Sequence, residues 1–256
     1  MKVSIITPSF NHAHFIRRTI ESVLNQDYID IEYIIMDGGS TDGTQDILKE
    51  FDGRLVWDSK SDGGQSDAIN KGIRKATGEI ICYLNSDDVL EHGAISKVVD
   101  FFENNNDVQW AYGKCRIVDL EDNEIRKPIT MYKNLLLRKY NYKKLLIENY
   151  ISQPSTFWRA SLHNELGYFD ENEKYVMDYE FWCRVGSKYQ AGVIPYYLAN
   201  FRMYSTSKSG NLNNSQFDDE LRVARKYCGD NKFIIIAHTL NKYKIKSVYR
   251  LMSFFG

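Results

Sequence analysis

The fold of this chain is decided by residues 78–88, which read GEIICYLNSDD. The apolar run at 80–84 is typical of a buried strand, and it ends abruptly in the polar residues 85–88. Open α/β sheets bind their ligands beyond the carboxyl ends of the strands. We therefore expect Asp87 and Asp88 to lie at the ligand-binding edge of a sheet.

Two adjacent carboxylates at such an edge need a physical reason. Side by side they repel each other, and partial burial raises the cost of ionising both. A divalent cation, which prefers hard oxygen ligands, would relieve that cost. Alternatively, Asp87 or Asp88 caps a helix that begins near Glu91. These residues alone leave both interpretations open.

The chain before this stretch alternates short strands with helices. Strands are expected at 2–8, 31–36 and 54–57, and helices at 11–26, at 44–51 and ahead of Gly78. This alternation predicts a mostly parallel sheet with right-handed crossovers. Three of its strands end in polar loops, at 9–11, 37–42 and 85–88. Because those loops share one edge of the sheet, that edge is the predicted site.

Composition limits the class of protein. A chain of 256 residues with 43% hydrophobic content can bury a large core without disulfides. Its four cysteines are widely separated, which favours a reduced, cytoplasmic protein. Pro8 and Asn11 interrupt the first apolar run, so no cleavable signal is expected, and no run is long enough to span a bilayer. A net charge of −1 argues against nucleic acid as the main partner.

Several further motifs recur in a fixed order. They read IITPSFN at 5–11, DGGSTDGT at 37–44, GQSDAINKG at 64–72, ATGE at 76–79, NSDD at 85–88, QPSTF at 153–157, MDYEFWCR at 177–184 and FR at 201–202. Together they resemble the family 2 glycosyltransferases of the GT-A fold. These enzymes move a sugar from a nucleotide-activated donor to an acceptor hydroxyl, usually with inversion.

The resemblance implies a domain organisation. It covers residues 1–210, which we expect to form a GT-A, Rossmann-like α/β domain with helices flanking a mostly parallel sheet. Within it, residues 1–110 would bind the nucleotide sugar, and residues 111–210 would supply the acceptor site and the catalytic base. Residues 211–256 are expected to form a helical carboxyl-terminal tail.

The resemblance also assigns the nucleotide-sugar site. Asp37 would contact the base or ribose, although it could instead cap the helix after Gly43. Phe10 would lie against the base, although core packing is an alternative. A plain turn at Gly63-Gly64 competes with a binding role for the residues around it. The implied donor-binding residues are Pro8, Phe10, Asn11, Asp37, Asp62, Gln65, Asp67 and Asp87.

A metal ion follows from the same resemblance. Mn²⁺ or Mg²⁺ bridging the donor phosphates would stabilise the charge that develops on the leaving nucleoside diphosphate. The resemblance makes Asp88 the direct ligand, with Asp87 beside it contacting the sugar or ribose. Asn85 turns the usual Asp-x-Asp pattern into Asn-x-Asp.

Asp178 matches the family's catalytic base. An Asp, with an ordinary pKa of about 3.9, is ionised at neutral pH and can take the proton of an acceptor hydroxyl. The alternative is an acid favoured in a first helical turn by the helix dipole. Met177 stands where the family usually has a second acid, and Tyr204 where it commonly has His. Candidates for acceptor or supporting contacts are Glu180, Trp182, Arg202 and Tyr204.

The tail after Asp230 is basic and aromatic and contains no acid. Lys242, Lys246 and Arg250 fall on one helical stripe. Such a helix is typical of a segment that lies on a membrane surface. It could equally pack on the catalytic domain or on a second subunit of a homodimer, and the sequence leaves these open.

The sequence thus predicts a metal-dependent, inverting hexosyl- or N-acetylhexosaminyltransferase. Its donor would be a nucleoside-diphosphate sugar, with uridine as the first choice of base. Its acceptor would be a glycan or a polyprenol-linked sugar in bacterial surface-polysaccharide synthesis, at the inner face of the cytoplasmic membrane. One alternative is a catalytically silent sugar-nucleotide-binding subunit. Another is a sugar nucleotidyltransferase, which should carry a basic, glycine-rich loop that residues 9–14 lack.

Overall fold

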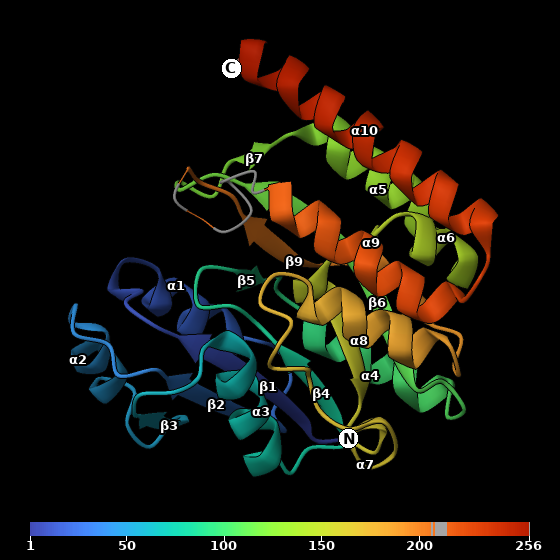
Figure 1. Cartoon of the computed structure of the whole chain (residues 1–256). Helices are drawn as coiled ribbons and strands as arrows, with labels where there is room; N and C mark the ends of the chain where they lie inside the picture. Colours follow the sequence, from blue (N-terminus) through green and yellow to red (C-terminus); the bar gives the residue numbers. More distant parts are fainter. Residues whose placement is uncertain (206, 208–213, 256) are drawn as a thin grey trace.

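The computed structural model describes residues 1–205, 207 and 214–255, with side chains except at 214–215 and 248–255. In this part of the chain, nine strands form one sheet in the order β3-β2-β1-β4-β8-β6-β9-β5, and β7 pairs with β6 (Figure 1). The strands are β1 (Val3–Ser9), β2 (Ile31–Asp37), β3 (Val56–Ser59), β4 (Ile80–Tyr83), β5 (Val89–Leu90), β6 (Trp110–Val118), β7 (Glu124–Ile125), β8 (Thr156–Arg159) and β9 (Gly192–Arg202).

Helices cover the sheet and continue into the tail (Figure 1). They are α1 (Ala13–Leu24), α2 (Thr44–Lys49), α3 (Gln65–Lys75), α4 (Ala94–Asn104), α5 (Lys127–Leu137), α6 (Tyr142–Ile147), α7 (Leu162–Leu166), α8 (Met177–Gly186), α9 (Asn214–Cys228) and α10 (Lys232–Phe255). A 3₁₀ turn, η1 (Gln153–Ser155), precedes β8. The expected boundary between domain and tail, at 210/211, lies outside the described residues.

The sheet is parallel in its amino-terminal half and mixed beyond it. β1 lies between β2 and β4, with Ile5 opposite Tyr33 and Cys82, and β3 extends the parallel order. β8 runs antiparallel to both β4 and β6, whereas β9 is parallel to β6. The direction reverses because η1 lies at the carboxyl end of β4, so β8 starts at that edge and runs back. The expected parallel order therefore holds only where strands and helices alternate.

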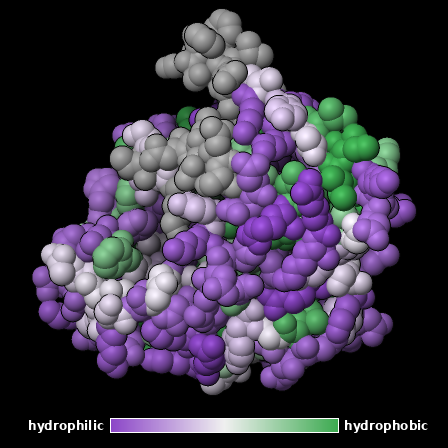
Figure 2. Space-filling model, viewed as in Figure 1, coloured by the Kyte–Doolittle hydropathy of each residue, from purple (hydrophilic) through white to green (hydrophobic). Residues whose placement is uncertain are grey.

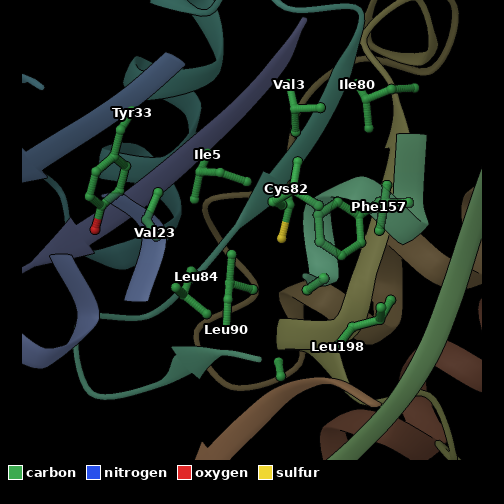
Figure 3. Packing of buried hydrophobic residues seen from close by; sticks show 14 of the residues in the cluster. Val3, Ile5, Val23, Tyr33, Ile80, Cys82, Leu84, Leu90, Phe157 and Leu198 are labelled. Carbon is green, nitrogen blue, oxygen red and sulfur yellow. The ribbon is translucent and has the colours of Figure 1, made fainter. Parts of the chain in front are cut away.

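Both faces of the sheet are buried, because successive strand residues point to opposite sides. On one face, residues such as Ile5 and Cys82 pack against α1 and α4 (Figure 3). On the other face, Ile6 and Tyr83 belong to a second core, which includes side chains of α3, α6 and α8. The continuous apolar run of β4 is thus explained by burial on both sides.

The tail packs on the domain. α9 lies along α8 and α6, and α10 lies along α6 and α9 (Figure 1). Val223 of α9 and Ile234 of α10 belong to the second core. His238 is 3% exposed, and its Nδ1 lies 2.8 Å from the carbonyl oxygen of Leu146. Packing on the domain, one of the three interpretations of the tail, therefore holds for α9 and the first turns of α10.

The other side of α10 faces solvent. Phe233, Ile236, Leu240 and Tyr243 are each more than half exposed. Figure 2 shows hydrophobic residues gathered over this part of the molecule. The basic stripe is partly engaged, because Lys242 pairs with Asp218, and the side chain of Arg250 lies outside the described part. Within the described residues, no helix combines the length and apolarity needed to cross a bilayer.

Candidate functional site

Three strand ends meet at one edge of the sheet. The loop after β1 is tied to the loop after β2, since the Asn11 amide donates to Ser40 Oγ at 2.7 Å and Asn11 Oδ1 accepts from the Thr41 amide at 2.9 Å. The loop after β1 also reaches the loop after β4, where His12 Nδ1 lies 2.6 Å from Ser86 Oγ. The edge predicted from three separate motifs is therefore one connected surface.

Phe10 stands at this edge with 61% of its surface exposed. Its ring lies beside Gly38, where an added Cβ would come within 3.2 Å of Phe10 and 3.0 Å of Asp62 Oδ2. Core packing, the alternative role for Phe10, is therefore wrong. Pro8 is buried within β1, opposite Met36, two residues before this ring.

Asp37 shapes the loop that follows it. It is 2% exposed, and its Oδ2 accepts from the amides of Gly39 (3.2 Å) and Ser40 (2.9 Å) and from the hydroxyl of Ser59 (2.6 Å). It does not cap α2, whose first turn is instead bonded by Asp42. The helix-capping alternative for Asp37 is therefore wrong, and the acid holds the backbone of 38–40 at the edge.

The loop before α3 borders the same edge. Asp62 accepts from the Gly64 amide at 2.8 Å, and Asp67 accepts from the Gly63 amide at 2.7 Å. The hydrogen bond from the Gly63 amide lowers the pKa of Asp67, and the bond from Lys71 lowers it further. Gln65 Nε2 donates to Asn85 Oδ1 at 2.7 Å, so α3 is connected to the Asn-x-Asp loop.

Asp88 is fully buried in the loop after β4. Its Oδ1 accepts from the Arg202 amide at 2.8 Å, and its Oδ2 accepts from Asn85 Nδ2 at 3.2 Å. Burial raises its pKa well above the usual range, and the neighbouring Asp87 raises it further. Asp87 is only partly buried, and its Oδ2 accepts from the Tyr204 hydroxyl at 2.9 Å.

Neither of these acids caps a helix. Residues 89 and 90 form β5, and α4 begins only at Ala94, after Gly93 and without a side-chain cap. The capping alternative for Asp87 and Asp88 is therefore wrong. The two adjacent carboxylates, one of which is buried, therefore need a bound group that offsets their charge.

The acid pair fits a divalent cation. Burial disfavours the lone negative charge on Asp88, and a bound cation would take the place of the proton that this burial favours. The described residues hold no group of three or more His, Cys, Asp or Glu side chains that could bind a metal. Mg²⁺ commonly uses one or two carboxylates and completes its shell with water and substrate phosphates. Asp87 and Asp88 would hold such an ion.

Arg202 and Tyr204 support the acid pair. Arg202 is 1% exposed, and its Nε donates to the Asp87 carbonyl at 2.9 Å. The same guanidinium bonds to the β6–β7 hairpin, through the Asp119 carbonyl at 2.6 Å and the carboxylate of Asp122. Tyr204 packs on Phe15 with ring centroids 4.9 Å apart. Both residues therefore fix the loop that carries the acids.

Asp178 is the second residue of α8 and is partly exposed. Burial raises its pKa, although its Oδ1 accepts from the Tyr179 amide at 2.8 Å. Its position is tied to the edge in two ways. Tyr83, at the end of β4, has a raised pKa. Burial of Tyr83 is the largest cause, and the negative charge of Asp178 is the second. Its neighbour Met177 contacts Ser66 of α3. Asp178 therefore lies beside this edge of the sheet.

Glu180 and Trp182 lie elsewhere on α8. Glu180 accepts from Arg184 at 2.6 Å, from Lys226 at 3.0 Å and from the Tyr227 hydroxyl, which places it between α8 and α9. Trp182 is fully buried and stacks on Trp110, with centroids 5.6 Å apart. A direct acceptor contact, one of the two roles expected for Trp182, is excluded because the side chain is fully buried, and its supporting role stays a prediction.

The structure adds two residues that the sequence did not single out. Gln153 of η1 donates to the Tyr83 carbonyl at 2.6 Å and lies 3.3 Å from Asn85 Nδ2. Its position in the QPSTF motif could have marked it. Glu220 of α9 is buried, and its pKa is raised first by burial and then by the charge of Asp178. No local pattern distinguishes it from the other acids of the tail.

Comparison with known proteins gives the family. The family model described as glycosyl transferase family 2 matches residues 4–167. A protein of Mycobacterium tuberculosis described as an uncharacterised glycosyltransferase is 33% identical over 187 residues, which cover 71% of this chain and 68% of that protein. The match covers 60% and 31% of two related glycosyltransferases from Rickettsia and 41% of one from Nostoc. This chain therefore spans less than two thirds of the length of those relatives.

Solved structures give the fold. The S. aureus protein TarS, solved with UDP-GlcNAc, matches with a TM-score of 0.68 and 15% identity, over 95% of this chain and 72% of that chain. The mannosyltransferase PcManGT from Pyrobaculum calidifontis, solved with GDP-Man and Mn²⁺, has a TM-score of 0.64 and 16% identity, over 99% and 80%. The expected GT-A type of α/β fold with carboxyl-terminal helices is thereby confirmed.

Proposed function

The chain belongs to glycosyl transferase family 2, and we propose that it is a metal-dependent, inverting glycosyltransferase. Its donor is a nucleoside-diphosphate sugar, and its acceptor is a hydroxyl of a glycan or a polyprenol-linked sugar. The observation that carries this proposal is the meeting of Phe10, Asp37 and the Asp87–Asp88 pair at one edge, beside the partly exposed Asp178. An exposed aromatic ring suits a nucleobase, and two acids suit the cation that accompanies a diphosphate.

The proposed roles follow from the chemistry of the step. The bond between the anomeric carbon and the diphosphate oxygen breaks, and the acceptor oxygen forms a bond to that carbon. Asp178 takes the proton of the acceptor hydroxyl, as a base beside the donor edge can. A bound cation would neutralise charge on the leaving diphosphate. Asp87 and Asp88 would hold that ion, while Arg202 and Tyr204 keep the two acids in place.

The donor base is open between uridine and guanosine. TarS was solved with UDP-GlcNAc and PcManGT with GDP-Man, and both match this chain at similar TM-scores. We place UDP-sugars first, as the sequence resemblance does. A ligand that binds only the native state raises the melting temperature. A thermal-shift panel of UDP-, GDP- and TDP-sugars with and without Mn²⁺ therefore tests donor and metal together.

The expected result is that one donor raises the melting temperature, and that Mn²⁺ increases this shift. Transfer is then measured with that donor and a panel of glycan acceptors. Stabilisation by no nucleotide sugar, with or without Mn²⁺, would overturn the proposed function. Binding without transfer to any acceptor would instead favour the catalytically silent subunit.

We further propose that the protein visits a membrane surface, as a polyprenol-linked acceptor requires. The support is the α10 apolar face, which consists of Phe233, Ile236, Leu240 and Tyr243. These side chains lie three or four positions apart, on the side of α10 opposite the buried Ile234 and His238. Lys232 and Lys244 are exposed on the same helix and would attract anionic lipid headgroups.

Point substitutions test this surface better than truncation, because deleting α10 would uncover the second core. Replacing Phe233 and Leu240 with Ser should reduce co-sedimentation with vesicles that contain anionic lipid, and leave the melting temperature close to that of wild type. The matched control is Ile29→Ser, which removes an exposed apolar side chain far from α10. Equal vesicle binding by the wild type and the double variant would exclude the α10 apolar face as the contact.

A further inference from the structure

The turn between β6 and β7 carries an acid, Asp122, that pairs with the buried Arg202. Asp122 has a left-handed backbone (φ 68°), and 45% of its side chain is exposed. Its Oδ1 accepts from the Arg202 guanidinium, and its Oδ2 lies 3.1 Å from Nη1 of Arg18 on α1. Arg18 also donates to the Leu120 carbonyl of the same turn at 2.8 Å. One carboxylate thus connects the arginine of β9 to the surface of α1.

Arg202 places a positive charge beside Asp87 and Asp88. Its amide donates to Asp88 Oδ1 at 2.8 Å, and its Nε donates to the Asp87 carbonyl at 2.9 Å. A guanidinium that is removed from water needs a counter-charge. Within the described residues, this guanidinium bonds to the carbonyls of Asp87 and Asp119 and to the carboxylate of Asp122. The acid that it pairs with is therefore Asp122, and not a member of the Asp87–Asp88 pair.

The loss of Asp122 would change what the guanidinium pairs with. The carboxylate of Asp119 already accepts from two amides of its own turn. Asp87 and Asp88 would then be the acids left to balance Arg202. A guanidinium bonded to their carboxylates would occupy the oxygens that a cation needs, and its charge would repel that cation.

We propose that Asp122 is a positioning residue, which neutralises Arg202 and so leaves the carboxylates of Asp87 and Asp88 available to a divalent cation. The proposal rests on the proposed function, in which this pair holds the ion. Asp122 acts through Arg202 and does not itself bind the ion. The turn between β6 and β7, which no sequence motif singled out, thereby supports the cation site.

Mn²⁺ binding tests this role without any transfer reaction. Free Mn²⁺ is measured by its EPR signal during titration with protein, alone and with UDP or GDP present. Asp122→Asn removes the charge but keeps a side chain that suits a left-handed backbone. We expect this variant to bind Mn²⁺ about tenfold more weakly than the wild type, as is typical for groups that support metal ligands. Unchanged Mn²⁺ affinity would overturn the proposal.

The matched control is Arg18→Gln, which releases the same turn from α1 but keeps the pair of Asp122 and Arg202. Because 51% of the Arg18 side chain is exposed, its ion pair contributes little. Its Mn²⁺ affinity should stay within about twofold of the wild type. An equal loss in Arg18→Gln and Asp122→Asn would show that anchoring of the turn, rather than the charge of Asp122, matters, and would contradict the proposal.

A double variant separates the effect of charge from that of packing. Asp122→Asn combined with Arg202→Met also removes the guanidinium, and the unbranched Met fills part of its place. The melting temperature should fall, because two carbonyls lose their donor. The Mn²⁺ affinity should nevertheless exceed that of Asp122→Asn by about threefold or more, because no guanidinium competes with the ion. An affinity as low as that of Asp122→Asn would contradict the proposal. If the double variant does not fold, the comparison of Asp122→Asn with Arg18→Gln decides.

Failure of this inference and failure of the proposed function give different results. If the wild type binds Mn²⁺ and Asp122→Asn binds it equally well, the inference alone is wrong. If the wild type binds no Mn²⁺, even with UDP or GDP present, the cation is removed from the proposed function and the inference is overturned with it.

Discussion

Two pairs of acids in this protein are each partly buried, and their surroundings offset the cost of that burial differently. Asp87 and Asp88 are neighbours in the chain, in a loop after β4, and no helix uses them as caps. Asp178 and Glu220 come from different helices, α8 and α9, which pack along each other. Burial raises the pKa of Asp88 in the first pair, and of both Asp178 and Glu220 in the second. The first pair is proposed to hold a cation, whereas in the second the burial of Glu220 favours its protonated form.

The difference teaches that the surroundings, rather than the acids themselves, decide the outcome. The first pair borders the edge where three polar loops meet, so phosphates and water can complete a metal shell. The second pair lies near Lys133, whose charge lowers the pKa of both acids, and Glu220 is buried. The predictions below test each pair, in order of decreasing effect.

The largest effect is expected from Asp178→Asn. Asn keeps the oxygen that accepts from the Tyr179 amide but cannot accept a proton from the acceptor hydroxyl. Transfer should fall at least about a hundredfold, while donor affinity and melting temperature stay close to wild type. Turnover at saturating donor and acceptor is the measurement. Turnover near that of the wild type would reduce Asp178 to a structural residue.

The next effect separates the members of the first pair. Asp88→Asn keeps an acceptor for the Arg202 amide, which Ala would leave unpaired in the core. Calorimetry should show that the variant loses about a hundredfold in Mn²⁺-dependent donor affinity, since a neutral amide is a poor cation ligand. Asp87→Asn, which keeps a partner for the Tyr204 hydroxyl, is the comparison and should lose less. An unchanged Mn²⁺ response in both variants would remove the metal from this pair.

The third prediction concerns stability and pH. The folded-state pKa of Glu220, about 7, lies above its usual value of 4.5, so the folded protein holds a proton that the unfolded chain releases. The wild type should lose up to about 3 kcal/mol of unfolding free energy as pH rises from 4.5 to 7. Glu220→Gln lacks this loss, so its stability relative to wild type should increase over that range.

Denaturant unfolding of both proteins at several pH values measures this difference. Asp218→Asn serves as the control. The pKa of Asp218 is lowered by its bond to Lys242, so this variant should become less stable relative to wild type as pH rises through the acid range. Parallel pH curves for wild type and Glu220→Gln would argue that Glu220 is ionised throughout.

The smallest effect on catalysis is expected from Glu180→Gln. This variant tests whether the loss of transfer is specific to Asp178 or follows removal of another acid of α8. Glu180 bonds to Arg184, Lys226 and Tyr227, away from the donor edge. Transfer should stay within about threefold of wild type, whereas stability should fall by about 1–2 kcal/mol, with a melting temperature several degrees lower. Glu165→Gln, at an exposed ion pair, should change neither. A larger loss of transfer than for Asp178→Asn would move the base to Glu180.

Local pattern was enough for the first half of the sheet. The strands expected at 2–8 and 31–36 are β1 and β2, displaced by a single residue at the ends. The helix expected at 11–26 is α1, between Ala13 and Leu24. These elements could be predicted because burial on both faces leaves a continuous apolar run, and one-sided burial leaves a helical period.

Side-chain direction could not be predicted in the same way. Phe10 and Trp182 are both aromatic residues inside motifs, yet Phe10 is exposed at the donor edge and Trp182 is stacked in the core. Glu180 and Asp178 are two positions apart and serve different neighbours. Which side of a strand end or helix meets the site depends on how the element is packed, and the packing partners are distant in sequence.

The sequence by itself determined the family, the alternation of strands and helices, and the edge at which Asp37, Asp87 and Asp88 gather. Each of these can be predicted from short stretches of neighbouring residues. Only the tertiary structure decided the reversal of the sheet at β8, the packing of the tail, and the burial of Glu220 on α9. Those features depend on burial and electrostatics between segments that the chain brings together only when it folds.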